Sequence, residues 1–189
     1  MKLYARLYQA VIRMVSPFLK WREPKILHSY LELVHALQTH HKQKVLLVTD
    51  VGLAKLKLYE DLVKVLERND IQVAHYLNVT SNPTITHALE ALDVYQKEHC
   101  EALIGFGGGS PLDVTKVVAA KVARPKKKIQ KMKGILTINA KIPLLIAVPT
   151  TSGTGSEATL AAVIIDEATK SKYAINDPSL FPHYAILLP

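Results

Sequence analysis

The sequence predicts a doubly wound α/β fold built around a mostly parallel sheet. Short apolar runs rich in Val, Leu and Ile recur along the chain, and such runs are typical of strands buried on both faces. Segments with helical spacing separate them, so that strand and helix alternate at roughly 30-residue intervals. Glycine-rich and hydroxyl-rich turns follow two of the runs, at the strand ends where such sheets bind ligands.

The elements follow in a regular order. We expect helices at residues 26–41, 56–68 and 111–123, and one that follows the turn 82–84 and runs to about residue 98, because apolar side chains recur there at helical spacing. We expect strands at residues 44–50, 71–77, 101–105 and 143–148, with a shorter strand at 161–165. Gly52 is expected to end the first strand. Residues 24–189 would then form one α/β domain.

Residues 1–23 are expected to form a separate basic amphipathic helix that ends before Pro24. Leu3, Leu7 and Val11 recur at helical spacing, and basic residues lie among them. The apolar residues never run long enough for a signal peptide or a membrane span. We favour a helix packed on its own domain or on a partner. The alternative is a helix that lies on an anionic membrane.

Charge and cysteine content bear on the compartment and the partners. Cys100 is the single cysteine among 189 residues, so no internal disulfide can form, and we expect a cytoplasmic protein. The net charge of +8 favours an anionic partner. Five lysines fall between Lys126 and Lys133 without an interleaved aromatic residue. We interpret them as a solvated loop, and nucleic acid is not an expected partner.

Residues 105–116, GFGGGSPLDVTK, join an expected strand to an expected helix. Three consecutive glycines, including Gly108 and Gly109, let a ligand approach the backbone closely. Ser110 is expected to cap the helix, and Asp113 to complete a capping box with it. Free N–H groups and the positive end of the helix dipole then favour phosphate or pyrophosphate. The alternative is a tight turn without a ligand.

Three better-known loops do not match this stretch. The third glycine of the G-x-G-x-x-G fingerprint is replaced by Ser110, and no Gly-Lys-Ser/Thr follows as in a Walker loop. The closing glycine of a nucleophile elbow is also missing. The stretch therefore indicates phosphate binding in general, and Ser110 is not expected to be a nucleophile.

A second polar loop follows the strand at 143–148. Hydroxyl groups and glycines crowd it, and they suit a phosphate or a ribose edge. Its candidate binding residues are Thr150, Thr151, Thr154 and Ser156. A capping box between Thr154 and Glu157 is the alternative use of both residues. Because the two loops follow equivalent strand ends, we expect them to form opposite walls of one crevice.

Asp50 ends the first expected strand. A carboxylate there can accept hydrogen bonds from an adenosine ribose and would repel a 2′-phosphate, which favours NAD over NADP. The alternative is an exposed turn aspartate before Gly52.

These motifs together resemble the iron-containing (group III) alcohol dehydrogenases across residues 24–189. The resemblance rests on Val48-Thr49-Asp50, on the turn Asn82-Pro83-Thr84, on residues 107–116 and on residues 149–157. It implies an N-terminal dinucleotide-binding domain with a Rossmann-like sheet and a C-terminal all-helical domain.

The resemblance assigns roles by position. It implies that Asp50 reads the ribose, that Asn82 contacts the nucleotide, and that Gly109 and Ser110 hold the pyrophosphate. Thr150, Thr151 and Thr154 would line the crevice towards the nicotinamide. Lys172, within Lys170-Ser171-Lys172-Tyr173, would approach the nicotinamide ribose. Its alternative is a surface lysine before a strand.

The resemblance also implies parts that this chain lacks. The family holds its divalent metal, iron or zinc, with one aspartate and three histidines of the helical domain, which would begin after Pro189. Leu188 stands where the family has an aspartate, and the glycine expected near residue 30 is absent. We therefore expect the cofactor half of a dehydrogenase for a small alcohol or aldehyde, with no catalytic residue or metal ligand of its own, inactive alone. Homo-oligomerisation stays open.

Two other functions stay open. One is a small-molecule kinase with a glycine-rich phosphate loop, although Gly109 and Ser110 replace that loop's aspartate and last glycine. The other is a non-catalytic nucleotide-binding module. Preference for NADH over ATP would exclude the kinase, and activity restored by a separately made helical domain would exclude the module.

Overall fold

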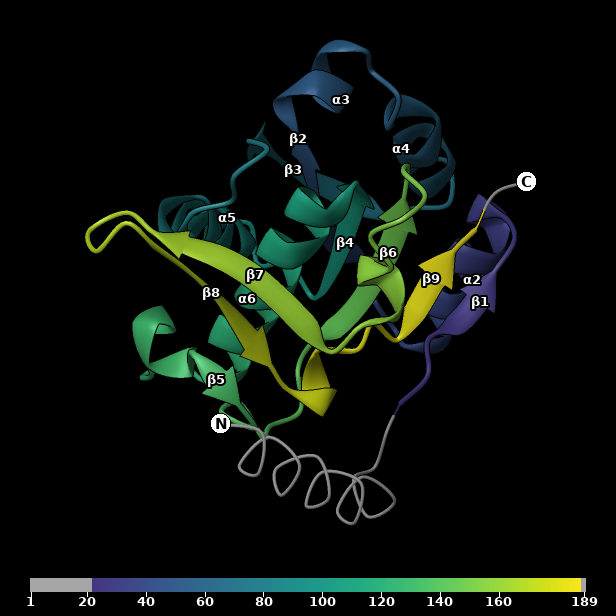
Figure 1. Ribbon diagram of the computed structural model, residues 1–189. Coiled ribbons are helices and arrows are strands. Elements are labelled where there is room, and N and C mark those ends of the chain that lie inside the picture. The colour runs from purple at the N-terminus through teal and green to yellow at the C-terminus, as the bar shows by residue number, and fades with distance from the viewer. Residues whose placement is uncertain (1–21, 188–189) are drawn as a thin grey trace.

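A computed structural model describes residues 22–187 of the chain, and its centre is a six-stranded sheet (Figure 1). Every neighbouring pair of strands is parallel, which confirms the predicted doubly wound fold. In spatial order the strands are β1 (Lys25–Leu27), β9 (Tyr184–Ile186), β6 (Leu144–Pro149), β4 (Ala102–Gly107), β2 (Lys44–Asp50) and β3 (Gln72–Val79). The expected leading helix lies outside the described residues, apart from its last two positions.

Helices cover both faces of this sheet. Helices α2 (Tyr30–Thr39) and α4 (Glu60–Glu67) pack on one face, where Val45 and Leu47 of β2 join their apolar cluster. Helices α5 (Ile85–Lys97) and α6 (Gly109–Ala123) pack on the other, with Leu46 and Val48. Successive residues of a strand point to opposite faces, so one continuous apolar run supplies both cores.

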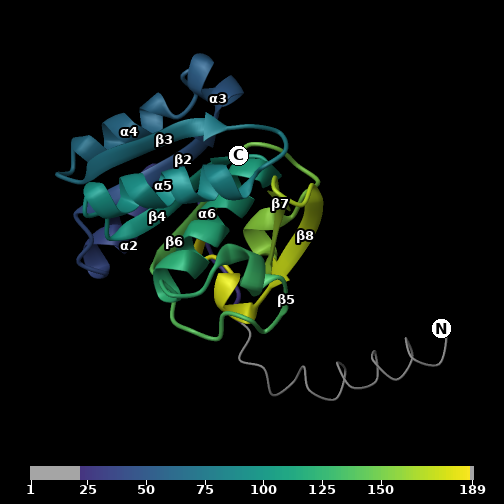
Figure 2. The same cartoon turned by 90° about the vertical axis from the view of Figure 1, so that its left-hand side faces the viewer.

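A second, three-stranded sheet lies on the far side of α6 (Figure 2). Strands β7 (Ala161–Asp166) and β8 (Ser171–Asn176) pair antiparallel, and β5 (Gly134–Ile135) pairs parallel with β8. Three short 3₁₀ helices connect the sheets: η2 (Ile129–Met132), η3 (Ser156–Ala158) and η4 (Pro178–Leu180). The strand predicted at 161–165 therefore exists, but it lies outside the parallel sheet.

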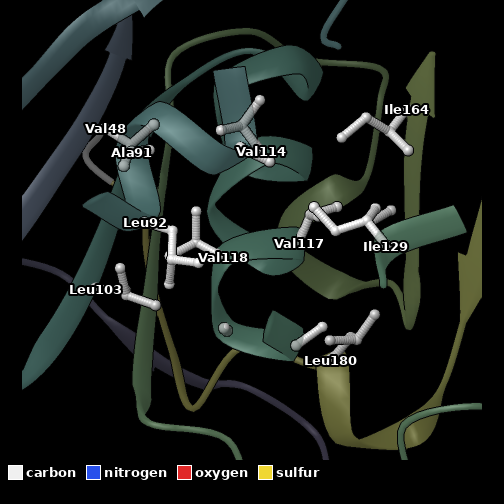
Figure 3. Close-up of a cluster of buried hydrophobic side chains, with 14 of the residues drawn as sticks. Val48, Ala91, Leu92, Leu103, Val114, Val117, Val118, Ile129, Ile164 and Leu180 are labelled. Carbon is white, nitrogen blue, oxygen red and sulfur yellow. The ribbon is translucent and has the colours of Figure 1, made fainter. Parts of the chain in front are cut away.

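Helix α6 is buried on every side because it lies between the two sheets. All residues from Pro111 to Ala120 are buried. Figure 3 shows Val114, Val117 and Val118 of this helix between Leu103 of the main sheet and Ile164 of β7. Burial around the whole circumference is the property of a central helix.

Several predicted boundaries were wrong. Residues 25–27 form β1, so the first helix starts only after its N-cap Ser29. Gly52 lies inside a short helix, α3 (Val51–Lys55), and the next helix begins at Glu60 because Lys57 turns the chain with a φ of 56°. Strands β8 and β9 were not among the strands that we expected from the sequence.

The lysine-rich segment is only partly a solvated loop. Lys126, Lys128, Lys131 and Lys133 are exposed, but Ile129 and Met132 between them are buried in the core. Within residues 22–187, no helix is long and apolar enough to cross a membrane.

The turn from β4 into α6 requires glycine at position 107. Gly107 has a φ of +139°, and a Cβ there would lie 2.6 Å from Cγ of Pro111 and 2.9 Å from Cδ1 of Leu53. We predict that Gly107→Ala lowers the free energy of unfolding by about 2–4 kcal/mol, from backbone strain and overpacking together. Urea unfolding of the full chain measures it.

The matched control is Gly153→Ala. Gly153 has a φ of +111°, but no atom lies within 4 Å of the position that a Cβ would take, so this variant carries the backbone strain without the clash. It should cost about 1 kcal/mol. Equal losses in the two variants would contradict the close packing assigned to Gly107.

His183 joins β9 to β6 and carries a second prediction. Its backbone N–H donates to the carbonyl of Leu145 at 2.7 Å, and its Nδ1 accepts the N–H of Leu145 at 3.0 Å. Burial and the nearby Arg22 guanidinium lower the pKa of His183 to about 4 from an ordinary 6.5. Protonation is therefore harder in the folded chain, so this contribution to stability is complete above pH 6.5 and is lost as the pH falls towards 4.

The control is His183→Asn, whose amide oxygen can accept the same N–H and does not titrate. The free energy of unfolding, measured by urea from pH 7 down to pH 4, should fall more steeply for the wild-type chain than for this variant. Parallel curves would show that His183 is not the titrating group.

Candidate nucleotide-binding crevice

The glycine loop enters α6 differently from the sequence prediction. The N-cap is Gly108, with α6 beginning at Gly109. Ser110 instead donates its hydroxyl to the carbonyl of Ser81 at 3.0 Å, and the carboxylate of Asp113 accepts the N–H of Val163 at 3.1 Å. The predicted capping box between Ser110 and Asp113 was therefore wrong, because each side chain bonds a different segment of the fold.

The start of α6 offers backbone donors. Helical geometry leaves the N–H groups of Gly109 and Ser110 without an acceptor inside the helix, and Pro111 has no N–H group. No acidic residue lies in the first turn of this fifteen-residue helix, so the positive end of its dipole is not neutralised locally. These features suit an anionic group such as phosphate.

The glycines also admit the second loop. A Cβ at Gly108 would lie 3.2 Å from Oγ1 of Thr151, and a Cβ at Gly109 would lie 3.4 Å from Oγ of Ser156. Strands β4 and β6 are parallel neighbours, so both loops leave the same edge of the sheet. Gly108 therefore lets the hydroxyl-rich loop pack closely against the start of α6, while a Cβ on Gly109 would make an ordinary contact with that loop.

Within the hydroxyl-rich loop, η3 begins at Ser156 after Gly155, which has a φ of 61°. Oγ1 of Thr154 accepts the N–H of Ser156 at 3.4 Å. The alternative capping box with Glu157 is thus not formed, because the 3₁₀ turn is entered from a left-handed glycine instead.

The two loops border a crevice of about 560 Å³. Six of the predicted site residues line it: Asp50, Gly108, Gly109, Ser110, Thr150 and Thr151. Leu53, Leu56 and Val79 form an apolar part of its wall that the sequence did not indicate, and no local pattern sets these three residues apart from core residues. Leu56 is 69% exposed, so it offers its side chain to a ligand. Such a wall suits a flat ring.

Asp50 combines a structural and a candidate binding role. Its Oδ1 accepts the N–H of Leu53 at 2.9 Å and so caps α3. Its Oδ2 lies near Gly107, at 3.3 Å from the position of an added Cβ. The side chain is half-buried and lines the crevice.

The other predicted residues lie outside the crevice lining. Asn82 and Thr154 are exposed in turns, and Lys172 is exposed on β8. Asp113 and Ser156 are buried beneath the loops. The crevice is thus lined by Asp50 and by predicted residues of the glycine loop and of the first half of the hydroxyl-rich loop. The remaining predicted residues lie outside the crevice or are buried beneath the two loops.

Burial shifts two titratable groups on α6. Burial raises the pKa of Asp113 to about 6, although the N–H of Val163 and the Lys116 ammonium oppose this. Burial lowers the pKa of Lys116 to about 8, although the negative charges of Asp113 and Glu157 oppose this. The sequence did not identify Lys116 as a buried polar residue. The one signal that could have done so is the presence of a lysine within the otherwise mostly apolar segment 114–120.

A divalent metal finds no matching ligand set here. Within residues 22–187, no group of three His, Cys, Asp or Glu side chains is placed to hold a metal ion. The crevice is lined by backbone groups, hydroxyls, apolar side chains and one carboxylate, which fit a nucleotide and not a metal centre.

Comparisons with known proteins agree with this geometry. The family model "Iron-containing alcohol dehydrogenase" matches residues 27–189. The chain is 35% identical over 147 residues to the NAD-dependent methanol dehydrogenase of Bacillus methanolicus, a match that covers 78% of this chain and 38% of that protein. It is 33% identical over 148 residues to the choline dehydrogenase of Bacillus subtilis, covering 77% and 37%.

Solved structures give the same picture. The NADH-dependent butanol dehydrogenase A of Thermotoga maritima superposes with a TM-score of 0.80 at 31% identity, covering 89% of this chain and 44% of that one. The chain thus spans less than half the length of these relatives. The match across nearly all of the α/β domain establishes that the chain belongs to the iron-containing alcohol dehydrogenase family.

Proposed function

We propose that this chain is the dinucleotide-binding half of an NAD-dependent alcohol dehydrogenase. The observation that carries the proposal is the start of α6, where two N–H groups and the helix dipole face a crevice walled by two strand-end loops. Family membership removes the kinase alternative. The relatives named for NAD or NADH support the choice of cofactor.

The crevice suggests an orientation for the dinucleotide. The pyrophosphate would lie over Gly109 and Ser110, at the positive end of α6. The adenosine would lie against Leu53 and Leu56, with the carboxylate of Asp50 accepting from its ribose. The nicotinamide end would then extend along the hydroxyl-rich loop. Among the predicted binding residues, Thr154 of this loop and Lys172 of β8 would approach that end.

The chain's own part in the reaction is binding and orientation. When bound, the nicotinamide accepts a hydride from an alcohol or donates one to an aldehyde. Residues of the crevice hold it at a fixed place on the sheet edge, and the hydroxyl-rich loop covers one side. The relatives are named for methanol, choline and butanol, so we propose only the class of a small alcohol and its aldehyde as substrate.

Parallel titrations with NADH, NADPH and ATP test nucleotide binding. Nicotinamide fluorescence measures the binding of NADH and NADPH, and calorimetry measures the binding of all three. We expect saturable binding of NADH, with weaker binding of NADPH and ATP. Asp50→Asn keeps an acceptor for the N–H of Leu53 but removes the charge that repels a 2′-phosphate. This variant should reduce the ratio of NADH affinity to NADPH affinity by about tenfold, or about 1.4 kcal/mol. Its thermal stability should be nearly unchanged. Binding of ATP alone would contradict the proposal.

The absence of turnover is a separate prediction. We expect the pure chain, supplied with NAD, Fe²⁺ or Zn²⁺ and an alcohol, to produce no NADH, because the described residues offer no metal ligand set. Absorbance of NADH with methanol, butanol or choline as substrate measures it. Turnover by the chain alone would refute its assignment as a half-enzyme, while no turnover together with NADH binding agrees with it.

A further inference from the structure

The outer edge of β7 is held by side chains of α6. Strand β8 occupies the other edge of β7. On the outer edge the backbone groups of Ala161, Val163 and Ile165 point away from β8, because alternate residues of a strand direct these groups to the same side. Lys116 and Asp113 bond the first two, and the carbonyl of Pro83 accepts the N–H of Ile165 at 2.9 Å.

Lys116 uses all of its hydrogen-bonding capacity on this edge. Its Nζ donates to the carbonyl of Thr159 at 2.8 Å, to Oγ1 of Thr159 at 3.1 Å and to the carbonyl of Ala161 at 2.9 Å. An ammonium group has three donors, so the three acceptors satisfy it. The side chain is 1% exposed, and it therefore reaches no ligand in the crevice itself.

Asp113 bonds the same segment at one further point and lies near a second. Its carboxylate accepts the N–H of Val163 at 3.1 Å, and the Ser156 hydroxyl lies near enough to stabilise its charged form and so to lower its pKa. Ser156 in turn lies 3.4 Å from the position of a Cβ on Gly109. One turn of α6 thus bonds the end of the hydroxyl-rich loop and the first half of β7.

We propose that Asp113 and Lys116 are positioning residues, which fix the segment 156–163 on α6 and thereby set the hydroxyl-rich loop against the glycine loop. The segment lies between Thr151 of the crevice and Lys172 of β8, so its position decides how these two residues face a ligand. The consequence for the dinucleotide rests on the proposed function. The ADP portion would meet Asp50 and the glycine loop, whereas only the nicotinamide end would depend on the Asp113/Lys116 pair.

Hydrogen exchange of the ligand-free chain tests the positioning directly. Lys116→Met keeps the apolar stem and removes the three hydrogen bonds, so amides 156–163 should exchange at least about tenfold faster than in wild type, while those of β2 and β4 stay unchanged. An unchanged rate at 156–163 would overturn the proposal. A uniform rise over the whole sheet would also overturn it, since it would indicate general destabilisation.

Asp113 supplies a pair of variants in case Lys116→Met does not fold. Asp113→Asn retains a carbonyl oxygen that can accept the N–H of Val163, whereas Asp113→Ala retains none. We expect local exchange near the wild-type rate in Asp113→Asn and faster local exchange in Asp113→Ala. Equal effects of the two would show that the hydrogen bond to β7 does not hold the segment.

Ligand binding then tests what the positioning serves. We expect Lys116→Met to weaken NADH binding by about tenfold and ADP binding by less than about twofold. The control is Lys97→Met, which removes the same charge and keeps a similar apolar stem on the exposed surface of α5, and it should change neither affinity. Equal losses of NADH and ADP would overturn the link to the nicotinamide end. A wild-type chain that binds neither ligand would refute the proposed function, and the exchange rates would still decide the positioning role.

Discussion

The burial of the central ten residues of α6, Pro111 to Ala120, is the constraint on which the rest of the structure depends. The parallel sheet lies against one side of this helix, and the small second sheet lies against the opposite side. Because ten consecutive residues are buried, each polar side chain among them must find hydrogen-bond partners within the protein. Lys116 and Asp113 find them on the backbone of β7, and this joins the second sheet to the first.

The same helix also creates the candidate site. Its first N–H groups lie at the carboxyl end of β4, beside the crevice. Gly107 forms the sharp turn between β4 and α6 that places them there. The hydroxyl-rich loop packs so closely that a Cβ on Gly108 would lie 3.2 Å from Oγ1 of Thr151, and Thr151 would have to shift to admit it. Tertiary packing therefore favours a small residue in the same loop that the proposed dinucleotide would approach, and the two demands have separate physical reasons.

The sequence predicted the parts of the fold that local patterns encode. The apolar runs at β2, β4 and β6 are buried on both faces, and α5 follows the turn that was predicted at residues 82–84. β1 and β9 could not be predicted, because each has three residues and is stabilised by pairing with a strand far along the chain. Capping was assigned wrongly at Ser110, because a tertiary contact with Ser81 took its hydroxyl. Crevice residues next to glycines were found, whereas Leu53 and Leu56 needed the folded shape to bring them there.

The pairing of β1 with β9 also has a consequence for the order of folding. Strand β9 lies between β1 and β6, so β1 cannot join the sheet until residues 184–186 have taken their place. Contacts of such long sequence separation form late, because a large loop must close before they contribute any stability. During synthesis on a ribosome, the first strand would therefore wait unpaired while β2, β3 and β4 assemble around α5 and α6. The edge of β6 would stay open to other chains for that interval, which exposes it to misassembly.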